Sequence, residues 1–283
     1  MKYRKFEFRL NDGAALFARE WRPEHDVKGV VCLVHGMGEH SGRYAHLALA
    51  LTQAGYALMS YDQRGHGKSL GQRGHTSSYE TLLDDIECFK QECLNHFPKI
   101  PFFLYGHSLG GNLVLNYCLR RQPKFQGVIV TSPWLRLTIE PSARVRLLAS
   151  LMNKVWPTFS LPSGIDVYAL SHDLSILDTY NLDPLVHDRI SVRMFTTVDQ
   201  AGFWAVENAA QFDLPLLLMH GGNDRITSSD ASSKFAAQIK KDCTLKIWPG
   251  LYHELHNEPE KTEIIAYLIN WLDSLTIEAK NSQ

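Results

Sequence analysis

A serine between two glycines is the strongest candidate in this sequence for covalent chemistry. Residues 106–110 read Gly-His-Ser-Leu-Gly, and they lie between an apolar run and a helix-like segment. Small residues on both sides of Ser108 allow the sharp strand-to-helix turn that exposes a nucleophilic hydroxyl. This five-residue motif alone would also fit a serine that caps a helix beside packing glycines. The position between a predicted strand and a predicted helix favours Ser108 as a nucleophile.

A serine hydroxyl is a weak nucleophile, so a base and an acid that orients the base should accompany it. On a strand–turn–helix scaffold of this kind the expected chain order is Ser, then Asp or Glu, then His. Asp224 and His253 each follow a predicted strand, and His253 follows the last one. We therefore expect both side chains at the same sheet edge as Ser108. His256 is the alternative base.

The negative charge of a tetrahedral intermediate needs two hydrogen-bond donors directed at it. We expect the first to be the backbone N–H of Leu109, which follows the nucleophile. The second is expected in residues 35–38, His-Gly-Met-Gly, which follow the first predicted parallel strand. Met37 is selected there by its position rather than by its side chain. The same residues could also form a glycine turn without a catalytic role.

Two other segments resemble phosphate or zinc motifs but lack a required residue. Residues 62–69 end in Gly-Lys-Ser like a P-loop, yet Asp62 stands where the first glycine should be. Residues 253–256 begin like a zincin helix, yet Asn257 stands where the second histidine should be. We therefore predict no metal ion and no other cofactor.

The positions of these residues depend on a recurring pattern of apolar runs followed by glycines and helix-like segments. Continuous apolar strands that alternate with helices are typical of a parallel sheet covered on both faces. Residues 3–10 and 14–21 instead alternate in polarity around Asn-Asp-Gly, which predicts an antiparallel hairpin. The predicted fold class is thus α/β, with an N-terminal hairpin and a mostly parallel sheet. The apolar runs are residues 30–34, 56–61, 102–105, 128–130, 216–219 and 244–248.

The pattern is interrupted over residues 135–203, where helix-like pieces follow one another without strands between them. Apolar side chains at helical spacing predict a helix over residues 144–156. We predict a core formed by residues 1–134 and 204–283, with residues 135–203 as an inserted cap, or lid, over the carboxyl edge of the sheet. The alternative is a set of extra helices packed on the core without a role in substrate binding.

Composition excludes several classes of protein. The 29 basic and 30 acidic side chains give a net charge of −1, which argues against a nucleic-acid partner. The longest apolar runs are far below the roughly 20 residues of a membrane-spanning helix, and the N-terminus lacks the apolar region of a signal peptide. The five cysteines include no Cys-x-x-Cys pair. We therefore expect a soluble protein in a reducing, cytoplasmic compartment.

Five segments resemble the monoacylglycerol lipases and related lysophospholipases, and together they span nearly the whole chain. The resemblance implies an α/β-hydrolase fold with a helical cap, and a cofactor-free serine esterase that acts on single-chain glycerolipids through an acyl-enzyme. It also implies a catalytic triad of Ser108, Asp224 and His253, with Met37 and Leu109 as oxyanion donors. The segments are residues 35–44 (His-Gly-Met-Gly-Glu-His-Ser-Gly-Arg-Tyr), 62–69, 106–111, 183–185 (Asp-Pro-Leu) and 252–258.

The same resemblance implies where a monoacylglycerol would lie. In such lipases polar residues near positions 39–40 tend to meet the glycerol head, and the cap supplies an apolar tunnel for the acyl chain. We therefore expect Glu39 at the head group, and Leu148, Met152 and Trp156 of the cap along the acyl chain. The apolar cap helix could in addition touch a membrane surface, or it could only roof the pocket.

Other activities remain open from the sequence. A lysophospholipase or a general carboxylesterase would use the same triad on another substrate, and an acyltransferase would differ only in the acyl acceptor. Outside the enzymes, the alternative is a lipid-binding receptor built on a hydrolase scaffold. The complete set of Ser, Asp and His counts against that alternative.

Overall fold

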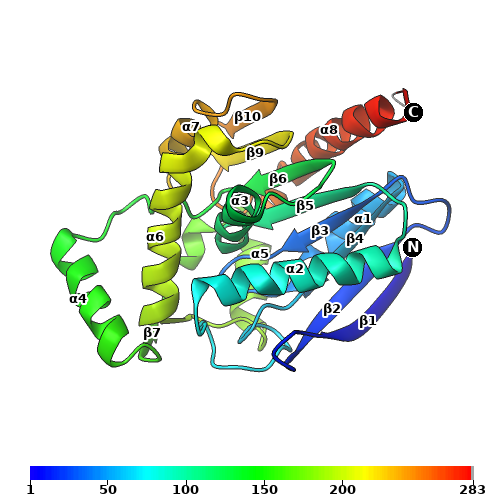
Figure 1. Ribbon diagram of the computed structural model, residues 1–283. Coiled ribbons are helices and arrows are strands. Elements are labelled where there is room, and N and C mark those ends of the chain that lie inside the picture. Colours follow the sequence, from blue (N-terminus) through cyan, green and yellow to red (C-terminus); the bar gives the residue numbers. More distant parts are fainter. Residues whose placement is uncertain (282–283) are drawn as a thin grey trace.

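The computed structural model describes residues 1–281 and has an eight-stranded sheet at its centre (Figure 1). The strand order is β1-β2-β4-β3-β5-β6-β9-β10. β1 and β2 form the predicted antiparallel hairpin, β2 pairs antiparallel with β4, and the remaining neighbours are parallel. The predicted fold class is confirmed. The strands are β1 (Lys2–Arg9), β2 (Ala15–Arg22), β3 (Gly29–Val34), β4 (Tyr56–Tyr61), β5 (Phe102–His107), β6 (Gly127–Thr131), β9 (Leu216–Gly221) and β10 (Cys243–Trp248).

Helices cover both faces of this sheet, because successive residues of the apolar strands point to opposite sides. In β3, for example, Val30 and Cys32 pack into one core cluster and Val31 and Leu33 into the other. Helices α1 (Ala45–Gln53) and α8 (Lys261–Asn281) cover the second face. The first face is covered by α2 (Tyr79–His96), α3 (Leu109–Arg121), α6 (Val192–Asn208) and α7 (Ser229–Ala236). Short 3₁₀ helices are Ser41–Tyr44, Val167–Ala169, Ala209–Gln211 and Leu255–Asn257.

The segment between β6 and β9 departs from this alternation, but it also contains a short strand pair that the sequence pattern did not indicate. It contains α4 (Ala143–Val155), α5 (Leu174–Leu182), α6, and a small antiparallel sheet of β7 (Ser160–Pro162) and β8 (Arg189–Ser191). Figure 1 shows α4 at the edge of the molecule, beyond α6. α4 agrees closely with the helix expected over residues 144–156.

The predicted end of the cap, between residues 203 and 204, falls inside α6. This helix packs on α3, where the side-chain amides of Asn112 and Asn116 donate hydrogen bonds to the carbonyl oxygens of Val198 (3.1 Å) and Ala201 (3.2 Å). α6 is therefore part of the helical layer of the core over residues that the sequence pattern assigned to the cap. Within residues 1–281, no helix combines the length and the apolar character that crossing a membrane would require.

Candidate active site

Ser108 occupies a strained turn between β5 and α3. Its backbone has φ +53° and ψ −114°, a conformation that costs energy for any residue with a Cβ. The carboxyl end of β6 holds this turn, since the N–H of Ser108 donates to the carbonyl oxygen of Thr131 and its own carbonyl oxygen accepts from the N–H of Trp134, each at 3.0 Å. This is the geometry that a nucleophile at a strand-to-helix turn requires.

The turn also depends on a glycine at position 110. A Cβ there would overlap the carbonyl oxygens of Val34 and His35 at the end of β3. Only glycine lets the first turn of α3 lie this close to the neighbouring strand. The spacing of glycines that identified Ser108 in the sequence thus has a direct steric cause.

Asp224 and His253 meet in a buried hydrogen bond between the carboxyl ends of β9 and β10. The distance from Nδ1 of His253 to Oδ2 of Asp224 is 2.7 Å. Oδ1 of the same carboxylate accepts the backbone N–H groups of Ile226 (2.7 Å) and Thr227 (2.9 Å). His220 holds Oδ2 from the other side at 3.0 Å. The carboxylate is therefore fixed, and it directs Nε2 of His253 away from itself.

The electrostatics of this pair suit a general base. Burial raises the pKa of Asp224, but the neighbouring His253 and His220 lower it more, so the pKa of this carboxyl lies well below its usual range. Burial lowers the pKa of His253, but the Asp224 carboxylate raises it more, so the pKa ends above its ordinary value of 6.5. Asp224 is thus ionised, and His253 is a stronger base than an isolated imidazole would be in the same place.

The three predicted triad residues converge on one edge of the sheet. The ring of His253 lies 4.9 Å from the ring of His107, the residue before Ser108. The Oγ of Ser132, at the end of β6, donates to the carbonyl oxygen of His253 at 2.8 Å. These contacts bring the loops after β5, β6 and β10 together around Ser108.

The alternative base, His256, has different surroundings. Its side chain is buried, and its ring stacks on Tyr44 with 4.7 Å between ring centroids. Over residues 1–281, neither of its ring nitrogens has a hydrogen-bond partner. Burial lowers its pKa to about 3. The carboxylate that would orient a base contacts His253 instead.

The loop after β3 lies against Ser108. A Cβ placed on Gly36 would come within 2.9 Å of Oε1 of Glu39 and 3.2 Å of the Cβ of Ser108, so glycine favours this close approach. Among the residues that the structure describes, the N–H groups of Met37 and Leu109 donate to no protein acceptor. Unpaired backbone donors in the loop that lies against the serine and in the residue after it are what an oxyanion hole requires.

Glu39 supports this loop from within. Its Oε1 accepts the N–H of Gly36 and the hydroxyl of Tyr44, both at 2.6 Å, and its Oε2 accepts Nη1 of Arg43 at 2.8 Å. Only 2% of Glu39 is exposed. Protein donors thus already bind the carboxylate that was expected to contact the glycerol head, which favours a role in holding the loop.

Sequence reasoning singled out neither Arg43 nor Glu254. The guanidinium of Arg43 donates to both oxygens of Glu254, at 2.6 and 2.7 Å, as well as to Glu39. Both residues lie in segments that resemble the lipases, at positions 35–44 and 252–258. No local spacing pattern indicated that they would meet.

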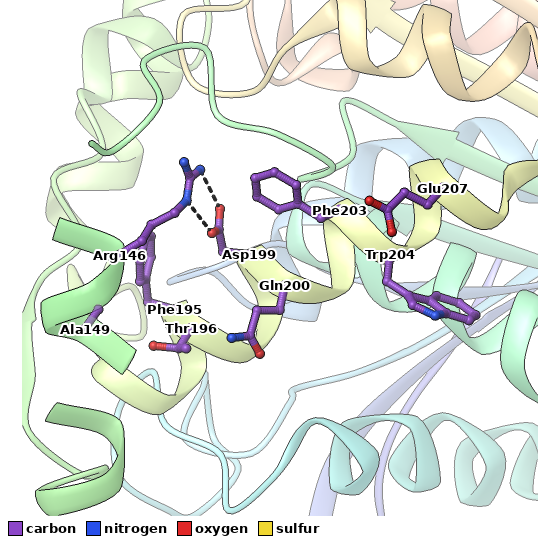
Figure 2. Close-up of a pocket in the computed structure, with 9 residues that line it drawn as sticks. All are labelled: Arg146, Ala149, Phe195, Thr196, Asp199, Gln200, Phe203, Trp204 and Glu207. Carbon is purple, nitrogen blue, oxygen red and sulfur yellow. Dashed lines mark hydrogen bonds and ion pairs between the residues drawn. The ribbon is translucent and has the colours of Figure 1, made fainter. Parts of the chain in front are cut away.

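Helix α4 turns a small and polar face toward α6 (Figure 2). Arg146 binds Asp199 through Nε (2.9 Å) and Nη2 (3.3 Å), and Nε of Arg193 donates to Oδ1 of Asn153 at 3.1 Å. A cavity of about 240 Å³ lies between the helices. It is lined by Arg146, Ala149, Phe195, Thr196, Asp199, Gln200, Phe203, Trp204 and Glu207.

The apolar side chains of α4 therefore point outward. None of its residues, all of which the structure describes, is buried. Leu148, Met152 and Trp156, expected along the acyl chain, are 66%, 38% and 55% exposed. They lie at the surface instead of over an enclosed tunnel, because the helix uses its Arg146 face to pack on α6. Val145, Leu147, Leu151 and Val155 are exposed as well.

Comparison with known proteins agrees with this geometry. The family model described as "Serine aminopeptidase, S33" matches residues 25–260. A monoacylglycerol lipase from Mycolicibacterium smegmatis is 31% identical over 90% of this chain and 91% of that protein. The crystal structure of the monoacylglycerol lipase of Paleococcus ferrophilus superposes with a TM-score of 0.84 at 35% identity, covering 92% of this chain and 99% of that one.

A further relative is an uncharacterized abhydrolase domain-containing protein of Dictyostelium discoideum. It is 37% identical over 96% of this chain, which spans only 29% of that longer protein. The family model and the lipase relatives each cover most of the chain, and the fold is that of an α/β-hydrolase. The chain therefore belongs to the serine aminopeptidase S33 family of α/β-hydrolases, and within it to the group of monoacylglycerol lipases and related enzymes that its motifs resemble.

Proposed function

We propose that this protein hydrolyses monoacylglycerols to glycerol and a free fatty acid through an acyl-enzyme. The observation that carries the proposal is the buried His253–Asp224 hydrogen bond next to the strained turn at Ser108. The lipase relatives support the ester substrate and the single acyl chain. The protein is accordingly a carboxylic ester hydrolase.

In the proposed reaction, Nε2 of His253 takes the proton of Ser108 as the serine oxygen attacks the ester carbonyl. Asp224 stabilises the imidazolium, and the N–H groups of Met37 and Leu109 bind the oxyanion. His253 then gives its proton to the leaving glycerol oxygen, and the acyl-enzyme remains. Water that loses a proton to His253 attacks this ester. His253 then returns that proton to the oxygen of Ser108 as the fatty acid is released, which restores the free enzyme.

The proposal extends to the part of residues 135–203 that precedes α6, as a cap through which the enzyme reaches its lipid substrate. The outward face of α4 is apolar, and the helix carries no acidic residue. Its exposed basic residues are Arg144 and Lys154, since Arg146 binds Asp199 on the side of α6. An apolar face beside basic residues is typical of helices that lie on anionic lipid surfaces. In this arrangement Leu148, Met152 and Trp156 would contact lipid at the membrane surface. Five cysteines, all unpaired in the structure, support a reducing, cytoplasmic compartment.

The test is fatty-acid release by the purified protein from 1-monooleoylglycerol, dioleoylglycerol, trioleoylglycerol and lysophosphatidylcholine. We expect the monoacylglycerol to be preferred. Ser108→Ala should lower kcat by several orders of magnitude without unfolding the protein, because the other triad members then have no nucleophile to activate. Ser60→Ala is a matched control, because it removes another buried serine hydroxyl, from β4, which donates to the carbonyl oxygen of Leu33 at 3.0 Å.

Each other outcome has a defined meaning. Preference for lysophosphatidylcholine would keep the mechanism and reassign the head group. Ser108-dependent hydrolysis of short esters alone would leave a general carboxylesterase. Absence of Ser108-dependent hydrolysis on every ester would refute the proposed function and favour a lipid-binding receptor.

A further inference from the structure

A chain of buried charges connects the two loops that carry the proposed oxyanion donor and the proposed base. Arg43 donates to Glu39, two residues after Met37, and to both carboxylate oxygens of Glu254, the residue after His253. Glu39 in turn accepts the N–H of Gly36, which precedes Met37. One guanidinium thus joins the loop after β3 to the loop after β10.

These charges are almost fully removed from water. The side chains of Arg43, Glu39 and Glu254 are 9%, 3% and 3% exposed. Burying three charges is expensive unless their geometry is well matched and their hydrogen bonds are made. The network meets this condition, since Asn257 also donates to Glu254 at 2.7 Å, and the guanidinium lies 4.8 Å from the ring centre of Tyr180.

We propose that Arg43 is a positioning residue for the ester hydrolysis, which fixes the oxyanion loop relative to His253 by binding Glu39 and Glu254 together. The inference rests on the proposed function, which assigns Met37 and His253 their roles. A planar guanidinium can bind one carboxylate with two parallel bonds while donating to a second, and an ammonium group cannot reproduce this. A lysine at this position would keep the charge and lose the fixed geometry.

The same network also contributes to the charge around His253. Asp224 binds Nδ1 of His253 and also contacts His220. The ring of His107 lies 4.9 Å from the rings of both His253 and His256. The carboxylates of Glu254 and Glu39 both contribute to raising the pKa of His253, after the larger effects of burial and Asp224. Neutralising Glu254 should therefore lower the pKa of His253, an effect that loss of packing alone would not produce.

The first test compares Arg43→Lys with Arg64→Lys. Arg64 makes an equivalent two-bond contact with Asp85, at 2.7 and 2.8 Å, and it pairs with Asp12 rather than with Glu39 or Glu254. We expect Arg43→Lys to lower kcat for monooleoylglycerol about 10–100-fold with little change in KM, because small displacements of catalytic groups cost rates of this order. Arg64→Lys should keep the kcat of the unmodified protein. An equal kcat in both variants would overturn the proposal.

The second test uses Glu254→Gln, which keeps the shape of the side chain and removes its charge. The acid limb of the pH profile of kcat/KM, which reports the base of the free enzyme, should move to lower pH. This variant decides the matter if Arg43→Lys does not fold, and an unmoved acid limb would then overturn the proposal. Failure of the proposed function can be told apart from failure of the role proposed for Arg43, because in the first case the unmodified protein would show no Ser108-dependent hydrolysis.

Discussion

The buried imidazole of His256 makes the stability of the protein depend on pH in mild acid. Only 2% of this residue is exposed, and its ring lies between Tyr44 and His107, with centroid distances of 4.7 and 4.9 Å. Neither ring nitrogen has a partner over residues 1–281. Because burial disfavours the charged ring, the pKa of His256 is lowered from 6.5 to about 3 in the folded protein.

The direction of this pH dependence follows from which state, folded or unfolded, binds the proton. Between pH 6.5 and pH 3 the unfolded chain protonates this histidine and the folded protein does not, so acid favours unfolding. At pH 5 this lowers the free energy of unfolding by about 2 kcal/mol relative to pH 7. The magnitude of this loss is set by the ordinary histidine pKa of the unfolded chain, because pH 5 lies well above the pKa of His256 in the folded protein. Replacing His256 with a residue that does not titrate removes this contribution.

The assay is urea denaturation of the unmodified protein, His256→Phe and His256→Asn at pH 7 and pH 5. Phenylalanine and asparagine will differ from each other in packing, and that difference should be the same at both pH values. The free energy of unfolding of each variant, taken relative to that of the unmodified protein, should be about 2 kcal/mol higher at pH 5 than at pH 7. If the difference from the unmodified protein is the same at both pH values for both variants, the argument from burial is refuted.

Two further predictions concern α3 and α4. Asn112→Leu removes three buried hydrogen bonds that connect α3 to Tyr79, to the loop after β6 and to α6. Because each buried group left unpaired costs about 1–3 kcal/mol, the free energy of unfolding measured by urea denaturation should fall by about 3 kcal/mol or more. A decrease below about 1 kcal/mol would contradict this. The double variant Leu148→Ser/Leu151→Ser should weaken binding to anionic vesicles about 30–100-fold, because burying each exposed leucine contributes about 1–1.5 kcal/mol. Ile277→Ser, which removes a 59% exposed side chain from α8, is the control, and equal binding by both variants would exclude α4 as the lipid-contacting surface.

The sheet and the nucleophile turn were predictable because their signals are local. Each apolar run forms a strand of the sheet, buried in all cases except β10, which is half-exposed. The glycines around Ser108 are required by atoms only a few ångströms away. Chain order and loop position were enough to select Asp224 and His253, which do form a hydrogen bond. In all of these cases the information lies within a few residues of the feature that it determines.

Two features of the site were not predictable in this way. The periodicity of residues 144–156 shows which side chains share a face of the helix, but it does not show whether that face meets protein or solvent. The partner of α4 was decided by Arg146 and Asp199, which are 53 residues apart. The contact between Arg43 and Glu254 spans 211 residues and leaves no pattern in either segment.

The undetected pair matters because Glu254 is one of three carboxylates that act on the base. Burial alone would lower the pKa of His253, and Asp224, Glu254 and Glu39 all raise it. A general base works best when its pKa lies near the working pH, and each of these carboxylates favours the protonated imidazole. Arg43 is bound to two of the three, and it therefore limits the charge that reaches His253 while it fixes the loops. On this view one buried arginine serves both the geometry and the pH range of the reaction, and its loss should disturb both together.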